Sequence, residues 1–150
     1  MSDLIRAIVS GGALAALLDG VCVTGLYSLK SIPAITLWQN VASSLLGEGA
    51  FTTGWTGGII GLLLHCGVAF TAATVFVFTA RWFPAILRHD NLSGVAFGLI
   101  VFVVMNLVVV PLSRMPKRTV PLSMISMQIV MHIVLVGLPI SISSRYFLTK

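Results

Sequence analysis

Three ionisable side chains interrupt apolar stretches of this sequence. His65 stands in the middle of Leu62–Phe70, and Asp19 and His132 lie within two other long apolar runs. A carboxyl group and two imidazoles can exchange protons or bind a polar ligand, and imidazoles also ligate metals. An ionisable group inside a bilayer is costly and is treated as a candidate functional residue. These side chains are therefore the first place to look for a site.

Two amides, Asn106 and Gln128, extend this set. A helix rises about 1.5 Å per residue, so the depth of each side chain follows from its distance to the helix end. Measured from the side that carries loops 28–54 and 114–120, all five polar groups lie about 9–16 Å deep. We expect them to form one polar layer that binds or translocates a small ligand or a proton. The structural alternative is a set of interhelical hydrogen bonds worth about 0.6 kcal/mol each.

The composition predicts how these residues are held. The chain has 150 residues, of which 57% are hydrophobic and 9% charged, and its mean hydropathy is +1.06. A soluble domain is about one-quarter charged, and a membrane-spanning helix needs about 20 apolar residues. The fold class predicted is therefore all-α, an integral membrane four-helix bundle forming a single domain over residues 1–150. Its four spans are expected at about 4–27, 55–80, 92–113 and 121–144.

The segment between the first two apolar runs has an amphipathic pattern. Pro33 suits the first turn of a helix, and the pattern continues to about residue 46. The apolar face is predicted to hold Ile35, Trp38, Val41, Ala42 and Leu45. The opposite, polar face is predicted to hold Thr36, Gln39, Asn40, Ser43 and Gly47. This pattern predicts an interfacial helix over about 33–46, with a re-entrant segment as the alternative.

Small residues recur at four-residue steps in three of the runs, which lets membrane helices approach closely. The helix-packing residues predicted in this way are Gly12, Ala16, Gly20, Gly57, Gly61, Gly94 and Gly98. We expect these faces to support a homo-oligomer or assembly into a larger membrane complex. Aromatic residues near the ends of the runs predict interfacial anchors. They are Tyr27, Trp38, Trp55, Trp82 and Tyr146.

The chain resembles a family of small four-helix bacterial inner-membrane proteins with no assigned activity. The matching stretches are Leu64–Phe70, Met105–Ser113, Met131–Pro139 and Trp38–Ser44. The resemblance implies the bundle topology and a bacterial inner (cytoplasmic) membrane location, and it implies no activity. Asp19 also resembles the first-helix carboxylate of small four-helix exporters, which are shorter and lack the interfacial loop.

Other function classes follow from the same residues. His65 and His132 on separate helices could ligate a single haem b, or the layer could bind a quinone. The glycine faces could instead serve an accessory subunit or assembly factor. The sequence contains no GxSxG, HExxH or P-loop motif, so we predict neither an enzyme nor a dedicated metal site. No cofactor is predicted beyond the haem alternative.

The formal charge of +5 does not indicate a nucleic-acid partner, because the basic residues lie at helix ends without a basic stripe. They divide between the two sides almost equally. The side of the termini carries Arg6, Arg81, Arg88, Arg145 and Lys150, and the other side Lys30, Arg114, Lys117 and Arg118. The small excess favours a multi-pass protein with cytoplasmic termini.

Overall fold

Four helices of the chain are long and apolar enough to cross a membrane. The computed structural model describes residues 2–117 and 120–149, and within them the structure is helical, without strands. The first and second long helices are α1 (Asp3–Leu29) and α3 (Trp55–Trp82). The third and fourth long helices run over Pro84–Leu112 and Leu122–Leu148. The all-helical class and the four apolar helices are thus confirmed, although the third begins at Pro84, eight residues before the expected position, and the fourth ends at Leu148, four residues beyond it.

The third and fourth long helices each contain a π-helical segment. The third comprises the 3₁₀ turn η2 (Pro84–His89), α4 (Asp90–Val104), the π-helical η3 (Met105–Val109) and α5 (Val110–Leu112). The fourth comprises α6 (Leu122–Met131), the π-helical η4 (His132–Gly137) and α7 (Leu138–Leu148).

A proline follows each π segment, and the hydrogen bonds show how the helix accommodates it. Pro111 and Pro139 lack the N–H that an α-helix would use at their positions. The residue before each proline bonds five residues back: Val110 N–H to the Met105 carbonyl, and Leu138 N–H to that of Ile133. The sequence indicates a distortion at Pro139, and the structure gives it the form of a wide turn that begins at His132. Such π segments occur frequently at functional sites.

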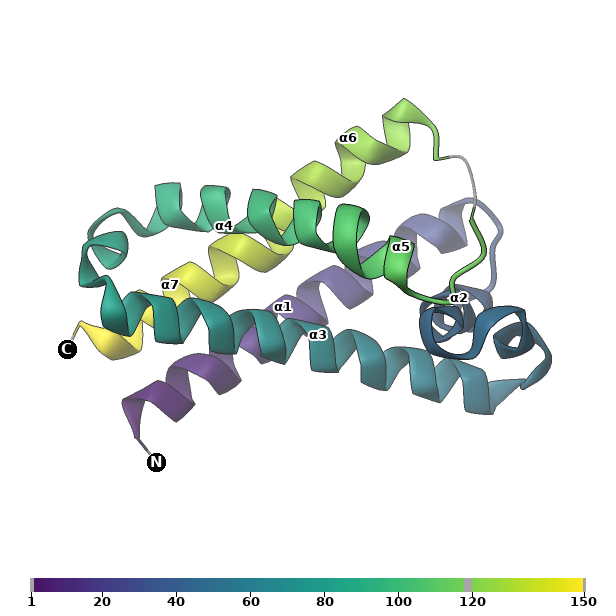
Figure 1. Ribbon diagram of the computed structural model, residues 1–150, viewed down its shortest axis with the longest axis horizontal. Coiled ribbons are helices and arrows are strands. Elements are labelled where there is room, and N and C mark those ends of the chain that lie inside the picture. Colours follow the sequence, from purple (N-terminus) through teal and green to yellow (C-terminus); the bar gives the residue numbers. More distant parts are fainter. Residues whose placement is uncertain (1, 118–119, 150) are drawn as a thin grey trace.

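Both termini and η2 lie at one end of the molecule, and the segment that connects α1 to α3 lies at the other, which we call the connecting-segment end (Figure 1). The connecting-segment end holds α2 (Ala34–Leu46) and the 3₁₀ turn η1 (Gly47–Thr52). In Figure 1 α2 is seen nearly end-on, so it runs across the direction of the long helices. Two residues used above for the charge distribution, Arg118 and Lys150, lie outside the described residues.

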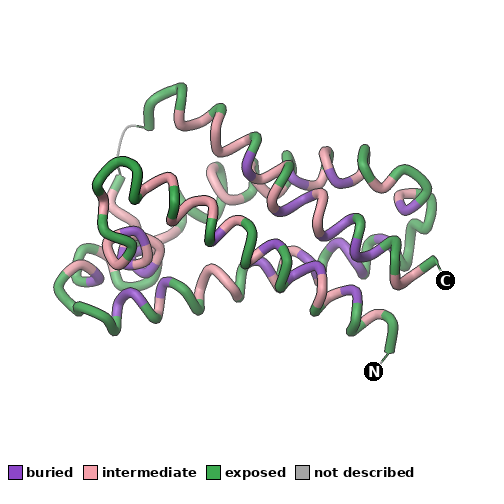
Figure 2. The backbone as a smooth tube through the Cα atoms, turned by 180° about the vertical axis from the view of Figure 1, so that it is seen from behind, coloured by how far each residue is buried: buried purple, intermediate pink, exposed green. Residues whose placement is uncertain are grey.

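The core is built from small side chains where α1, α3 and the fourth long helix cross. Buried positions gather at this crossing and around α2, whereas α6 stands apart from the other helices (Figures 1 and 2). The buried apolar cluster consists of Ala15, Ala69, Ala73, Phe76, Ala80, Leu87, Val136 and Ile140. Alanines at these positions let the helix axes approach closely.

The glycines of α3 and α4 make their close contacts within this chain. A Cβ atom on Gly61 would overlap the backbone carbonyl of Trp38 in α2. A Cβ atom on Gly98 would lie 2.6 Å from the carbonyl oxygen of His132, and one on Gly94 would lie 3.0 Å from Cα of Leu138. These rows therefore pack α3 against α2, and α4 against η4 and α7.

The first helix and the start of α3 use their small residues in the same way. A Cβ atom on Gly12 would lie 3.1 Å from Cα of Phe70, so α1 and α3 nearly touch there. A Cβ atom on Gly57 would lie 3.3 Å from Cγ of Gln39.

The polar and apolar faces of α2 differ from the amphipathic prediction. Gln39 and Ser43, expected on the polar face, are buried, and Leu45, expected on the apolar face, is exposed. The reason is that this face packs on the glycines of α3, where Gln39 Nε2 donates a hydrogen bond of 2.9 Å to the Gly54 carbonyl. The helix itself is confirmed, but the side that it buries is fixed by α3.

An ion pair joins α4 and α7 at the end of the molecule where the termini lie. Arg145 Nη1 lies 2.7 Å from Asp90 Oδ1, and the Asp90 side chain is only 15% exposed. Asp90 also stands in the first turn of α4, where a carboxylate is favourable for the helix dipole. In addition, Ser141 Oγ donates to the backbone carbonyl of Asp90.

Replacing Asp90 by asparagine will lower the midpoint of thermal unfolding by about 2–4 °C. This corresponds to about 1 kcal/mol, the upper range for a partly exposed ion pair in a chain of this size. Circular dichroism in detergent measures the shift. The matched control is Asp3→Asn, whose pair with Arg6 is longer, at 3.4 Å, and more exposed, and which should leave the midpoint unchanged. Equal shifts in the two variants would contradict the prediction.

Candidate functional site

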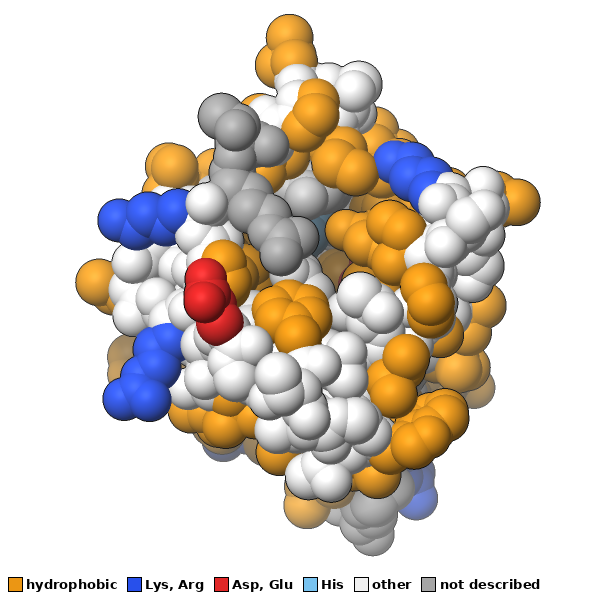
Figure 3. All heavy atoms as spheres, turned by 90° about the vertical axis from the view of Figure 1, so that its right-hand side faces the viewer, with side chains coloured by type: hydrophobic (Ala, Val, Ile, Leu, Met, Phe, Trp, Pro, Cys, Tyr) orange, Lys and Arg blue, Asp and Glu red, His pale blue; other side chains and the backbone are white. Residues whose placement is uncertain are grey.

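A cavity at the connecting-segment end brings Asp19, His65 and His132 together. We call it the Asp19 cavity; its volume is about 390 Å³, and α1, α2, α3, the third long helix and η4 all contribute to its lining. Viewed from that end, the surface is hollowed, with histidine atoms visible in the depth of the hollow (Figure 3). Three of the five residues of the predicted polar layer therefore share one space.

The two ring nitrogens of His65 face different partners. Nε2 lies 3.0 Å from the carbonyl oxygen of Ala16, and Nδ1 lies 4.0 Å from Oδ2 of Asp19. The His65 and Asp19 side chains are only 17% and 19% exposed. Because a carbonyl oxygen only accepts, Nε2 must carry a hydrogen and donate it to Ala16.

This tautomer decides where a proton can sit between the two side chains. In a neutral ring with hydrogen on Nε2, Nδ1 presents a lone pair toward the Asp19 carboxyl group. A lone pair facing a carboxylate is unfavourable unless one proton is held by the carboxyl oxygen or by Nδ1. A separation of 4.0 Å is too long for a direct hydrogen bond and suits a bridging water. In this arrangement the two side chains can share one proton.

Small residues of α1 and an aromatic ring of α2 make the slot for the His65 ring. A Cβ atom on Gly20 would lie 3.4 Å from His65 Nε2, so a larger side chain there would press on the ring. On another side the Trp38 indole packs edge-on, with ring centroids 5.3 Å apart and planes at 61°. Trp38, predicted as an interfacial anchor, thus also contacts His65.

His132 reaches the Asp19 cavity from the first position of η4. Its Nδ1 lies 2.8 Å from the carbonyl of Gln128, and its ring packs edge-on against Phe102 at 5.7 Å. With Nδ1 as donor to that carbonyl, the neutral ring keeps an acceptor at Nε2. His132 also interacts electrostatically with the Asp19 carboxyl group, as His65 does. The close crossing at Gly98 fixes the backbone from which this ring extends.

Asn106 and Gln128 do not join the cavity, in contrast to the predicted five-residue layer. The third long helix lines the cavity with Val101, Met105, Val109 and Val110, and Ser113 follows its last turn. Asn106 is not among the lining residues, and its Nδ2 donates to the Phe102 carbonyl of its own helix at 3.0 Å. Gln128 lies in α6, which diverges from the bundle, and it contributes only its backbone carbonyl, to His132.

Two hydroxyl groups accompany the ionisable residues. Ser44 from α2 and Ser113, just after α5, both line the Asp19 cavity, and each donates to a carbonyl of its own helix at 2.8 Å. The backbone also connects these segments, because Arg114 N–H donates to the Ser44 carbonyl at 2.9 Å. Neither serine nor Trp38 was predicted as a site residue. The sequence did contain one signal for the role of α2. The glycine row of Gly57 and Gly61 indicated a closely packed neighbour, and no helix had been assigned to it.

The other four predicted interfacial anchors lie near the ends of their helices. Trp55 and Trp82, at the ends of α3, are each 76% exposed. They are separated by about 40 Å at 1.5 Å per residue. Tyr27 is half-buried near the end of α1, and Tyr146 is exposed and packs edge-on against Phe147.

The donor set of the site bears on metal and haem binding. Among residues 2–117 and 120–149, no three His, Cys, Asp or Glu side chains are grouped as a metal site. The haem alternative requires a free nitrogen on both His65 and His132. On His65, Nε2 is occupied by the Ala16 carbonyl and Nδ1 faces Asp19, so this ring would have to rotate before it could ligate iron.

Comparison of the chain with protein-family models, with curated proteins and with solved structures finds no match.

Proposed function

We propose that the chain is an integral membrane protein whose four long helices cross a bilayer. Large apolar side chains such as Leu17, Leu63 and Ile100 are exposed along their outer surfaces. The distance of about 40 Å between the two exposed tryptophans of α3 matches the thickness of a bilayer with its headgroups, about 40–45 Å. In this placement α2 lies across the membrane direction at one interface. Both termini then lie on one side, for which we propose the cytoplasmic side of a bacterial inner membrane.

Within that membrane, the protein binds a small ligand that exchanges a proton with Asp19 and His65. The observation that carries this proposal is the contact of His65 Nε2 with the Ala16 carbonyl, which leaves Nδ1 facing the Asp19 carboxyl group in the Asp19 cavity. If Asp19 and His65 had only a structural role, they would need hydrogen-bond partners but no particular tautomer of His65. Here the proton stays available, because water or a ligand in the Asp19 cavity can reach it. His132, on a helix far along the chain, offers a second hydrogen-bonding position to the same ligand.

The proposal is tested by infrared difference spectroscopy of the protein in lipid nanodiscs, between acidic and alkaline buffer. The wild type should show a carboxylic-acid C=O band that changes together with imidazole ring bands. Asp19→Asn should remove the carboxylic-acid band that changes together with the imidazole bands, because the shared proton has lost one of its two holders, while the bands of Asp3, Glu48 and Asp90 should remain.

Asp3→Asn is the matched control, since Asp3 lies in the same helix and is 63% exposed. It should leave the coupled signal intact. A wild-type spectrum without coupled carboxyl and imidazole bands, or the same coupled bands in Asp19→Asn, would overturn the proposal.

A further inference from the structure

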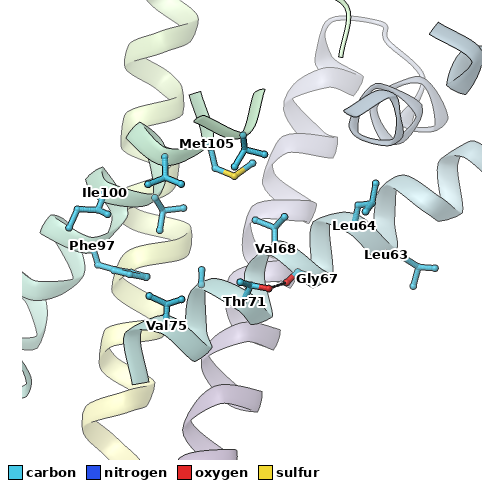
Figure 4. Close-up of a pocket in the computed structure, with 13 residues that line it drawn as sticks. Leu63, Leu64, Gly67, Val68, Thr71, Val75, Phe97, Ile100 and Met105 are labelled. Carbon is cyan, nitrogen blue, oxygen red and sulfur yellow. Dashed lines mark hydrogen bonds between the residues drawn. The ribbon is translucent and has the colours of Figure 1, made fainter. Parts of the chain in front are cut away.

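A second, apolar cavity lies between α3 and α4. We call it the α3–α4 groove; its volume is about 470 Å³, and it faces outward along the two helices (Figure 4). Its lining contains no ionisable side chain. The hydroxyl of Thr71 donates a hydrogen bond of 2.8 Å to the Gly67 carbonyl (Figure 4). Thr71 therefore adds no unpaired donor to the apolar surface of the groove.

The α3–α4 groove and the Asp19 cavity are neighbours separated by a single layer of side chains. Six residues line both spaces: Leu64, Val68, Ala72, Val101, Met105 and Val109. Met105 in this layer has a flexible side chain and begins the π segment η3. One ligand with a polar and an apolar part could therefore occupy both spaces at once.

The depth of the two spaces restricts the class of ligand. On α3 the groove extends from Leu63 to Val75, which is about 18 Å along the helix and close to its middle. His65 stands at the near end of this range. A phospholipid keeps its charged headgroup at the interface, because a charge near the bilayer centre is costly. His65 stands ten residues, or about 15 Å, from the start of α3, so a head that reaches it is expected to be uncharged.

The hydrogen-bonding groups of the Asp19 cavity specify that head further. The proton shared by Asp19 and His65 can be donated to a carbonyl oxygen, and Nε2 of His132 can accept from a hydroxyl. A quinone ring offers carbonyl oxygens, and its reduced form offers hydroxyls. We infer that the ligand is a lipid-soluble quinone, with its ring in the Asp19 cavity and its single hydrocarbon tail in the α3–α4 groove. This inference rests on the proposed function, since it names the ligand of the same site.

Quenching of Trp38 fluorescence by decylubiquinone in lipid nanodiscs tests the inference. The chain has three tryptophans, so Trp55→Phe/Trp82→Phe leaves Trp38, which packs on His65, as the only reporter. We expect saturable quenching in this background. Val68→Phe fills the layer between the two spaces and should weaken binding at least about tenfold, a clear change in Kd.

Ile59→Phe is the matched control, because Ile59 lies on the same helix, is 58% exposed and lines neither space. It should bind as the background does. Met105→Phe, in the π segment η3, is a second variant that should weaken binding as Val68→Phe does, and circular dichroism checks that both variants keep the fold. Quenching that does not saturate, or equal weakening in Val68→Phe and Ile59→Phe, would overturn the inference. The coupled infrared bands of Asp19 and His65 would still be measurable in that case, so the two proposals fail separately.

Discussion

Replacing Gly61 by alanine will destabilise the protein by about 1–3 kcal/mol, the cost of overpacking a tight contact. The new Cβ atom would lie 2.7 Å from the carbonyl carbon of Trp38 and 3.1 Å from the amide nitrogen of Ala42. Both neighbours are backbone atoms of α2, so they can move only if the whole helix moves. That movement would take the Trp38 indole away from His65, and its fluorescence should change in parallel.

Gly67→Ala provides the matched control on the same helix. No atom lies within 4 Å of a Cβ atom built on Gly67, so alanine there should stabilise the protein by about 0.5–1 kcal/mol through helix propensity. Unfolding by sodium dodecyl sulfate, followed by circular dichroism, measures both variants. The two substitutions are chemically identical, and only the distance to α2 separates them. Effects of the same sign would show that α2 does not pack on α3 as described.

The contact at Gly61 also shows why the sequence predicted the helices better than their partners. Long apolar runs predict long helices, because the number of consecutive apolar residues can be compared directly with the number needed to span the hydrocarbon core of a bilayer. A four-residue row of glycines indicates a close approach but carries no information on which helix approaches. The glycine rows were expected to support a homo-oligomer or assembly into a larger complex, and in the structure they also serve contacts within the chain, of Gly61 with α2 and of Gly98 with η4.

For the site, the sequence predicted the depth of each residue but not the direction in which its side chain points. Depth along a helix follows from residue number, so Asp19, His65 and His132 were placed at a common level and share a cavity in the structure. Rotation about the helix axis does not follow from depth. Asn106 stands between the lining residues Met105 and Val109 in the sequence, yet its side chain donates to the Phe102 carbonyl and does not line the cavity. Gln128 lies on α6, and its divergence from the bundle has no signature in the hydropathy pattern.

His65→Leu will destabilise the protein by about 3 kcal/mol, and Asp19→Leu by a similar amount, whereas the double variant will be close to wild type in stability. Removing one member of a buried polar pair leaves the other without its partner, which costs about 3–5 kcal/mol. The lower end applies because the two side chains are 17% and 19% exposed and can reach some water. Replacing both members by apolar side chains is often neutral, since no polar group is then left uncompensated.

The double-variant cycle separates a structural role of the pair from a chemical one. Unfolding by sodium dodecyl sulfate gives the three free energies, and Leu18→Ala/Leu64→Ala, at the positions that precede Asp19 and His65 in the sequence, controls for altered packing. If the losses of the two single variants simply add, Asp19 and His65 do not interact and the shared proton is excluded. If the double variant is as stable as wild type, folding does not require the pair, and that result would support the chemical role proposed for it.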